Sequence, residues 1–410
     1  MTDFTPSVSA ERSFHPGPFC AGLIVCLLAS LIVPRSLSFL PGAAGLILMF
    51  YYIGTARRWI RPHMTETFFI LAIAALSALS ALWSVDPDFA LERSGKTALT
   101  LLPSLCLIAL CRAPDLTVKP RLIWILFGLH VTAALLLSAE MLFDMPFYRL
   151  VHDIPEVERV SLAKLNRHIV VLSLTWLPLL YGVWRSGSSF RQRLSAVILL
   201  TLSTICALSL TESQTAQAAF ALSVVFYFLF PYKWKSAWIA MGVLITGLAI
   251  AAPWAIRPAF DALPKNATDY KIMRMASIPH RLEIWNFAAT EALKHPVRGN
   301  GVEALRFMTS AEMMKYPGAN HILHPHNAIM QIWVEFGLSG ILLGCALILY
   351  LLYRSWQAPI YTRALFLALI VTCLGMSVTG YGLWQGWQLG LFAFVAALGL
   401  TVSRVQPSPS

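Results

Sequence analysis

Long apolar runs separated by short polar loops repeat along almost the whole chain. Because a membrane-spanning helix needs roughly twenty mainly apolar residues, the runs predict an all-α membrane protein with about twelve spans. The predicted spans are 19–33, 37–54, 67–83, 97–111, 122–139, 169–184, 194–210, 216–230, 237–253, 328–352, 364–379 and 385–402. The first run has no small-residue cleavage site, so we expect it to remain as the first span.

Composition and charge agree with this class and orient the chain. Hydrophobic residues make up 57% of the 410 residues and charged residues 12%, too few polar side chains to cover a globule in water. Lys and Arg collect in alternate loops, which by the positive-inside rule predicts that both termini are cytoplasmic. These residues are Arg57, Arg58, Arg61, Arg112, Lys119, Arg121, Arg185, Arg191, Arg193, Lys233, Lys235, Arg354 and Arg363.

The basic excess, 31 Lys and Arg against 20 Asp and Glu, is scattered along the chain. We therefore expect anionic membrane lipids or phosphate groups as partners, and no nucleic acid. The seven cysteines lie in or beside apolar runs without CxxC spacing, so we interpret them as small core residues.

The chain divides into spans one to nine (1–253), a long outward-facing loop (254–325), spans ten to twelve (326–402) and a cytoplasmic tail (403–410). Within the loop, 281–294 predicts an amphipathic helix that ends at His295-Pro296. The apolar stripe predicted for it consists of Leu282, Trp285, Ala289 and Leu293. A turn at 298–301 and a second, polar helix at 302–315 follow.

Three histidines stand just before span ten, in the segment His321-Ile-Leu-His324-Pro-His326-Asn327. They are consistent with polar capping of the next helix, with Asn327 near its N-cap. Metal binding is less well supported, because no HExxH or Cys/His ligand spacing accompanies them. The third interpretation is a general base, since a neutral imidazole can take a proton from a hydroxyl near pH 7.

Other polar residues on the same side are candidates for contacting a ligand or for facing the bundle interior. Arg281, at the start of the amphipathic helix, suits bidentate binding of phosphate, although a solvated loop charge is the plain alternative. Arg167 abuts an apolar run and must snorkel or find an anion. Glu212 and Gln214 lie in the turn between spans seven and eight. Glu335, inside span ten, should face the bundle interior with a partner.

One motif resembles that of a known family. His326-Asn327, nine residues, Gly337, two residues and Gly340 fit the pattern H-[NSQ]-x9-G-x-x-[GTY] of the bacterial O-antigen ligases. Upstream, Arg281-x3-Trp285 and Pro296-x2-Gly299-x-Gly301 are similar as well, and the resemblance covers about 208–344. The family joins O-antigen polysaccharide to lipid A-core.

The resemblance implies a GT-C-like glycosyltransferase in the bacterial inner membrane with its active site in the periplasm. The donor would be undecaprenyl-diphosphate-linked O-antigen and the acceptor lipid A-core, with no cofactor and no metal. His326 matches the family base for the acceptor hydroxyl, and Arg281 matches the loop arginine that holds the diphosphate. His321, His324 and Asn327 would contact substrate. A second family arginine is replaced here by Gln214, and Arg167 is our candidate substitute.

Three alternatives remain open. An O-antigen polymerase or a protein O-oligosaccharyltransferase would share the same motif, although the latter commonly carries a soluble C-terminal portion. A transporter for lipid-linked glycans would favour inverted repeats or midplane charge pairs, of which Glu335 is the main candidate.

Overall fold

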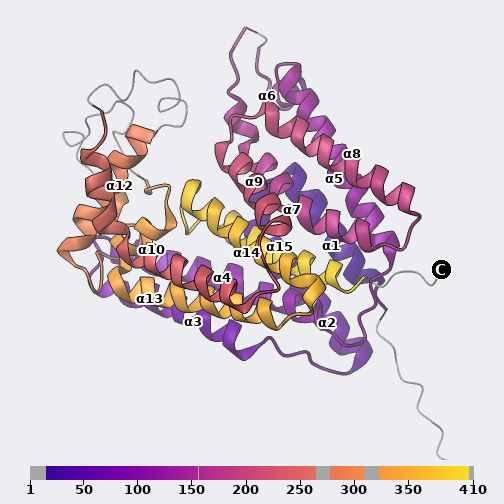
Figure 1. Cartoon of the computed structure of the whole chain (residues 1–410), viewed down its shortest axis with the longest axis horizontal. Coiled ribbons are helices and arrows are strands. Elements are labelled where there is room, and N and C mark those ends of the chain that lie inside the picture. The colour runs from indigo at the N-terminus through magenta and orange to yellow at the C-terminus, as the bar shows by residue number, and fades with distance from the viewer. Residues whose placement is uncertain (1–14, 156, 265–277, 309–322, 406–410) are drawn as a thin grey trace, which may run out of the picture.

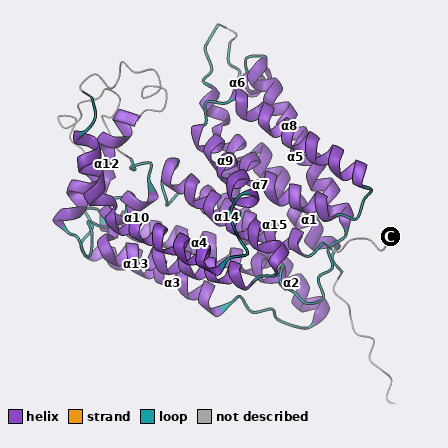
Figure 2. Cartoon of the chain, viewed as in Figure 1, coloured by secondary structure: helices purple, strands orange, loops and turns teal. Residues whose placement is uncertain are grey.

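The computed structural model describes residues 15–155, 157–264, 278–308 and 323–405. Within these ranges the chain is helical, with a single isolated bridge between Val118 and Val405, which confirms the predicted all-α class (Figures 1 and 2). The helices are α1 Gly17–Ile32, α2 Leu40–Ala56, α3 Met64–Leu79, α4 Pro87–Leu110, α5 Pro120–Leu142, α6 Pro146–His152, α7 Asn166–Arg185, α8 Phe190–Leu210, α9 Gln214–Phe228, α10 Lys235–Asp261, α12 Ile278–Lys294, α13 Ala328–Gln357, α14 Ile360–Thr379 and α15 Gly386–Ser403.

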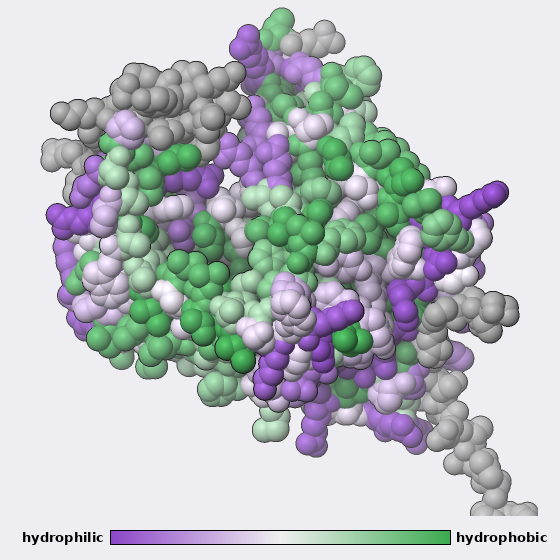
Figure 3. Space-filling view, viewed as in Figure 1, coloured by the Kyte–Doolittle hydropathy of each residue, from purple (hydrophilic) through white to green (hydrophobic). Residues whose placement is uncertain are grey.

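Lipid is the natural solvent for this bundle. In the described part of the chain, 8 helices or helical segments are long and apolar enough to cross a membrane, and α1, α2 and α9 are shorter apolar helices. Only 17% of the apolar window of α10 is buried, against 83% for the segment that contains α7. Figure 3 shows broad apolar areas on the visible face. The chain is therefore a multi-pass membrane protein, while the number of twelve spans stays a prediction.

Two helices have other bounds than those predicted. α4 begins at Pro87 rather than near residue 97, because Asp86 caps it by accepting a hydrogen bond from the Phe89 amide at 2.9 Å. Its first turns are charged, so the apolar pattern did not reveal them. α10 continues through Pro253 and Pro258 to Asp261, well past the predicted end at residue 253.

The loop before α13 holds the predicted amphipathic helix, α12, beginning three residues earlier than expected. The predicted stripe is correct only in part: Ala289 is buried and Trp285 packs against the same apolar cluster, whereas Leu293 is 37% exposed. α12 instead packs against α10 and α13 with a face that includes Ile284, Ala288 and Ala292. Small alanines allow close helix packing there. The predicted helix at 302–315 appears as a short 3₁₀ turn, Ala304–Arg306, and residues 309–322 lie outside the described residues.

α13 is broken at Gly337, whose φ of 58° and ψ of −146° leave the helical region. The turn 296–301 satisfies the backbone groups that the break releases: the Leu338 and Ser339 amides donate to the carbonyls of Pro296 and Val297, at 2.8 and 3.1 Å. In return, the amides at 300 and 301 donate to the carbonyls at 334 and 335, both at 2.8 Å. Irregular backbone at membrane depth is tolerated where protein satisfies it in this way.

The helices define two ends of the bundle. The starts of α7, α9, α13 and α15 and the end of α14 form what we call the histidine end, since residues 324 and 326 lie there. The ends of α4, α7, α13 and α15 and the starts of α5 and α14 form the basic end. By the charge pattern, the histidine end is the one predicted to face outward.

Candidate functional site

The C-terminal end of α14 gathers three side chains from separate parts of the chain. Thr379 is its last residue, and its carbonyl accepts hydrogen bonds from Arg281 Nη1 at 2.7 Å and Thr215 Oγ1 at 3.1 Å. The next carbonyl, that of Gly380, receives the ring of His326 at 2.6 Å. Carbonyls at a helix C-terminus have no partner within the helix and carry partial negative charge, so they suit these donors. The two residues with predicted catalytic roles therefore bind consecutive carbonyls.

The contact with Gly380 fixes the state of the His326 ring. A carbonyl oxygen only accepts hydrogen bonds, so Nδ1 must carry the proton. In the neutral ring Nε2 then holds the lone pair that can take a proton from a substrate. The residue keeps a solvent-accessible side, from which a substrate can approach the ring.

Backbone geometry also supports the orientation of His326. Its φ of 53° lies in the left-handed region, which costs about 1–3 kcal/mol for such a residue. Neighbouring contacts hold it there: Trp285 Nε1 donates to the Pro325 carbonyl at 2.7 Å, and the Asn327 side chain caps α13. Trp285, part of the Arg281-x3-Trp285 spacing, thus holds the backbone next to His326 in place.

Electrostatics keep the histidines neutral. Desolvation by the surrounding protein is the main cause that lowers the pKa of His326, and the neighbouring Arg281 and His280 lower it further against the opposing effect of the Gly380 hydrogen bond. Burial, and then the nearby His326 and Arg306, lower the pKa of His324 to about 4. The two rings lie 4.3 Å apart between centroids, and both are set to be neutral near pH 7.

Arg281 is half-buried, and this burial lowers the pKa of its guanidinium, although it stays charged at any pH of interest. Within the described residues, one of its five N–H groups is bonded, to the Thr379 carbonyl, and the others can serve a ligand. A partly desolvated guanidinium binds phosphate more strongly than one in water.

Arg167 lies at the same end, beside the α14–α15 connection. Its guanidinium carbon stands 5.6 Å from the ring centroid of Trp387, and Trp387 packs edge-on against Tyr381. Arg167 Nε is buried and has no hydrogen-bond partner among the described residues, and Arg35 is close enough to repel it. The start of α7 is tied to the segment before α9, because Thr211 Oγ1 donates to Asn166 at 3.4 Å.

The other predicted site residues have different surroundings. Asn327 is the N-cap of α13, its side-chain oxygen accepting from the amides at 329 and 330, which agrees with the capping interpretation. Gln214 is the first residue of α9, directly before Thr215, and it is exposed like Glu212. His321 lies outside the described residues. The described residues bring together no three His, Cys, Asp or Glu side chains suited to a metal ion.

Glu335 faces the interior with partners, as predicted. It is 1% exposed, and its two carboxylate oxygens accept from Gln331 Nε2 at 2.8 Å and Trp384 Nε1 at 2.5 Å. Gln331 also accepts from the Leu383 amide at 2.8 Å, so this network ties α13 to the α14–α15 connection. With both oxygens bonded, Glu335 serves to fix this connection and is poorly placed as a nucleophile.

Sequence reasoning missed the α14–α15 connection, residues 380–385, which the site is built around. It supplies the Gly380 carbonyl, Tyr381 near Arg167, and Gly382, where an added Cβ would lie 2.9 Å from the His324 ring. The available signal was the run Gly-Tyr-Gly-Leu-Trp-Gln-Gly-Trp at 380–387, rich in glycine and aromatic residues on the predicted outer side. Arg35 was missed because a single arginine in a short turn forms no recognisable motif in the sequence.

The helical bundle and the Arg281–His326 cluster at one of its ends define a multi-pass membrane protein with a polar site at a membrane boundary. A family model described as O-antigen ligase matches residues 196–345, a region that runs from α8 into α13 and includes Arg281, His326 and the Gly337 break. This match confirms the resemblance drawn from the motif, because residues 196–345 are similar to the O-antigen ligase family.

Three bacterial relatives agree with this. A protein of Rickettsia conorii named "Putative polysaccharide ligase" is 26% identical over 249 residues, covering 58% of this chain and 57% of that protein. Proteins of the same description from Rickettsia bellii and Rickettsia typhi are 27% and 26% identical, over 58% and 56% of this chain and the same shares of their own length. The matched region thus spans little more than half of each relative.

Proposed function

We propose that this chain is a glycosyltransferase of the polysaccharide ligase type, an O-antigen ligase. It would transfer glycan from undecaprenyl diphosphate to a hydroxyl of lipid A-core at the periplasmic face of the inner membrane, without a metal and with inversion. The observation that carries the proposal is the pair of contacts at the end of α14, where His326 and Arg281 bind consecutive carbonyls.

This pair supplies the two groups that such a transfer needs. The acceptor oxygen attacks the anomeric carbon, the bond from that carbon to the diphosphate oxygen breaks, and the electron pair leaves with the lipid diphosphate. His326 Nε2 takes the hydroxyl proton and later releases it to water. Arg281 neutralises the charge that develops on the leaving diphosphate. In-line attack on the face opposite the leaving group gives inversion.

A second cation would lower the cost of placing two phosphates at the boundary of the membrane. Arg167 is our candidate, since its Nε is buried without a hydrogen-bond partner among the described residues and it lies against Trp387, beside the connection that holds His326. An anion there would also relieve its repulsion with Arg35. In this proposal, Arg167 takes the place of the family arginine that is Gln214 here.

The proposal is tested with purified chain in detergent, supplied with undecaprenyl-diphosphate-linked O-antigen and lipid A-core. We expect glycan-bearing lipid A-core, detected by its mass, from the wild type, and strongly reduced product from His326→Ala and Arg281→Ala. Transfer that persists in both variants would overturn the roles of base and diphosphate clamp. Elongation of the donor glycan without transfer to lipid A-core would favour an O-antigen polymerase over a ligase.

A further inference from the structure

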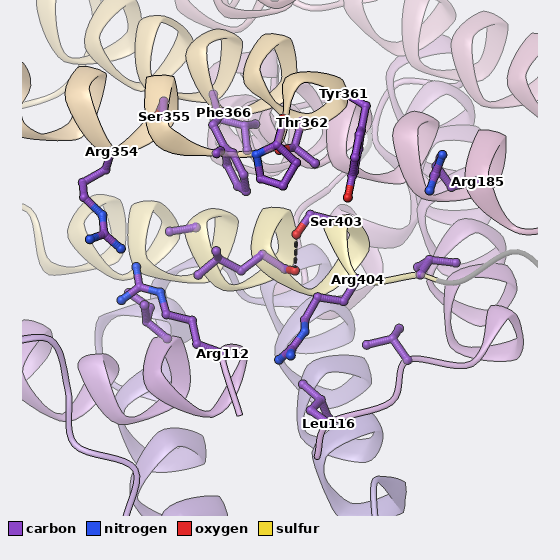
Figure 4. A pocket seen from close by; sticks show the side chains of 18 of the residues that line it. Arg112, Leu116, Arg185, Arg354, Ser355, Tyr361, Thr362, Phe366, Ser403 and Arg404 are labelled. Carbon is purple, nitrogen blue, oxygen red and sulfur yellow. Dashed lines mark hydrogen bonds between the residues drawn. The ribbon is translucent and has the colours of Figure 1, made fainter. Parts of the chain in front are cut away.

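A large cavity lies at the basic end of the bundle, away from Arg281 and His326. Its volume is about 1130 Å³, and it opens between the end of α4, the start of α5, the end of α13 and the start of α14. Figure 4 shows arginines on opposite sides of this opening, Arg112 and Arg354 on one side and Arg185 on the other. No step of the proposed glycan transfer uses this cavity.

The cavity carries a strong excess of positive charge. Five basic residues line it, and Glu66 is the only acidic one in its lining: the five are Arg112, Lys119, Arg185, Arg354 and Arg404. Glu66 is already bound by Arg112 through two hydrogen bonds of 2.9 and 2.7 Å. Of the residues that the structure describes, none offers a carboxylate to Arg185, Arg354 or Arg404 within ion-pair distance.

The partners that hold these three arginines include no carboxylate among the described residues. Arg185 lies over the ring of Tyr361 at 5.3 Å, Arg354 Nη1 contacts His63 at 3.4 Å, and Arg404 donates to the carbonyls of Cys111 and Ala113. These contacts orient the guanidinium groups and leave their charge in place. A site built in this way attracts a multivalent or doubly hydrogen-bonding anion such as phosphate.

The rest of the lining is apolar. Leu105, Ile108, Phe366, Leu369 and Leu400, from α4, α14 and α15, form part of the wall. Because α14 and α15 are candidate membrane spans, the cations sit at the membrane boundary and the apolar wall lies deeper. A free anion would use only the rim, whereas a molecule with a phosphate head and an alkyl chain would cover both parts.

We propose that this cavity binds an anionic phospholipid of the surrounding membrane, with its headgroup at the arginine-lined rim and an acyl chain against the apolar wall. Basic pockets between transmembrane helices recognise anionic headgroups through this combination of charge and apolar surface. The site is independent of the chemistry at the histidine end. It belongs to the opposite leaflet, which is the cytoplasmic one by the charge pattern.

Native mass spectrometry of the purified full chain tests this, with phosphatidylglycerol titrated in detergent and phosphatidylcholine as the neutral comparison. We expect saturable binding of phosphatidylglycerol, and a dissociation constant raised on the order of thirtyfold in the double variant Arg185→Gln/Arg354→Gln. Neither residue holds the backbone, so the variant should fold. Its melting temperature without lipid, compared with that of the wild type, checks this point.

The matched control is Arg58→Gln/Arg61→Gln, which removes two exposed charges from a loop at the same end but outside the cavity lining. Its dissociation constant should stay within about twofold of the wild type. An equal loss in the control would mean general surface attraction and would overturn the site, as would unchanged binding in Arg185→Gln/Arg354→Gln. Competition by inorganic phosphate at the same concentration as the lipid would assign the cavity to a free anion and overturn the lipid proposal.

Discussion

The two ends of the bundle use arginine in similar ways but differ in what else they hold. At the basic end Arg404 donates to carbonyls just past the end of α4, and at the histidine end Arg281 donates to the last carbonyl of α14. Among the described residues, the histidine end differs in holding imidazoles with lowered pKa, and one of them, His326, has a positive φ. The basic end holds groups that stay charged, and so it is suited to binding without proton transfer.

This difference shows that exposed helix carbonyls and arginines alone do not define a catalytic site. The distinguishing element is an imidazole that can accept a proton at neutral pH and is held by a contact that fixes its tautomer. In the described part of the chain, His326 combines an accessible side with that contact at the predicted outer face. Substitutions at the two ends should therefore have unequal effects on transfer, with the largest effect at His326.

Removing the base should have the largest effect on transfer. His326→Gln keeps a polar side chain but loses the proton acceptor, so we expect a fall in kcat of about 10²–10⁴-fold. The control is His152→Gln, at the end of α6, because His152 is also exposed and also bonds a carbonyl through Nδ1, at 3.0 Å. A fall of equal size in the control, measured by product formation, would contradict the assigned role.

Disrupting the close contact between the 296–301 turn and the break in α13 should mainly lower the stability of the fold. A Cβ on Gly299 would lie 2.3 Å from the Glu335 backbone, and its φ of 66° is unfavourable for other residues. For Gly299→Ala we expect the free energy of unfolding to fall by about 2–4 kcal/mol. Gly128→Ala, where nothing lies within 4 Å, should leave it unchanged or slightly raised. A thermal melt in detergent compares the two variants. Equal melting temperatures would contradict a stabilising role for the contact between Gly299 and α13.

Replacing the planar guanidinium of Arg281 by an ammonium group should weaken binding of the diphosphate. Arg281→Lys keeps the charge but loses bidentate geometry, so we expect kcat/KM to fall about tenfold to a hundredfold. Arg298→Lys, where the arginine lies over Trp83 at 5.9 Å, is the control and should change kcat/KM less than about threefold. If both variants behave alike with the lipid-linked donor, Arg281 does not hold the diphosphate.

The pH dependence of transfer should reveal the environment of His326. Since desolvation and the neighbouring Arg281 lower its pKa below 6.5, activity should persist below that pH and fall only as His326 becomes protonated. In Arg281→Gln one positive neighbour is lost, so the acid limb of kcat/KM should move up toward 6.5. If the acid limb of kcat/KM does not shift in Arg281→Gln, a group other than His326 determines it.

The smallest effect is expected from the opposite end. Arg185→Gln/Arg354→Gln should change kcat for transfer in detergent by less than about twofold, because the cavity shares no residue with the site. A large loss of transfer there, with an unchanged melting temperature, would show that the two ends are coupled.

Much of the fold followed from the sequence because lipid imposes a simple rule on helix length and polarity. The positions of α12, of the turn at 299–301 and of Asn327 as N-cap were predictable, since apolar period, glycine and capping residues have local signatures. The contacts of Arg281 and His326 were not, because a carbonyl acceptor is present in every residue and leaves no mark in the sequence. The prolines of α10 misled in another way, since they lie inside the helix without ending it.

The use of carbonyls at Thr379 and Gly380 has a consequence for how this protein tolerates change. Every amino acid presents the same carbonyl, so no exchange of the side chain at position 380 deletes the acceptor of the His326 proton. A substitution can disturb this hydrogen bond only by moving the main chain. A side chain at position 380 would do so through a clash with Thr215, because its Cβ would lie 2.7 Å from Thr215 Cγ2. Tolerance to mutation should therefore be governed by the shape of the α14–α15 connection, and sequence drift in relatives can be extensive wherever that shape is kept.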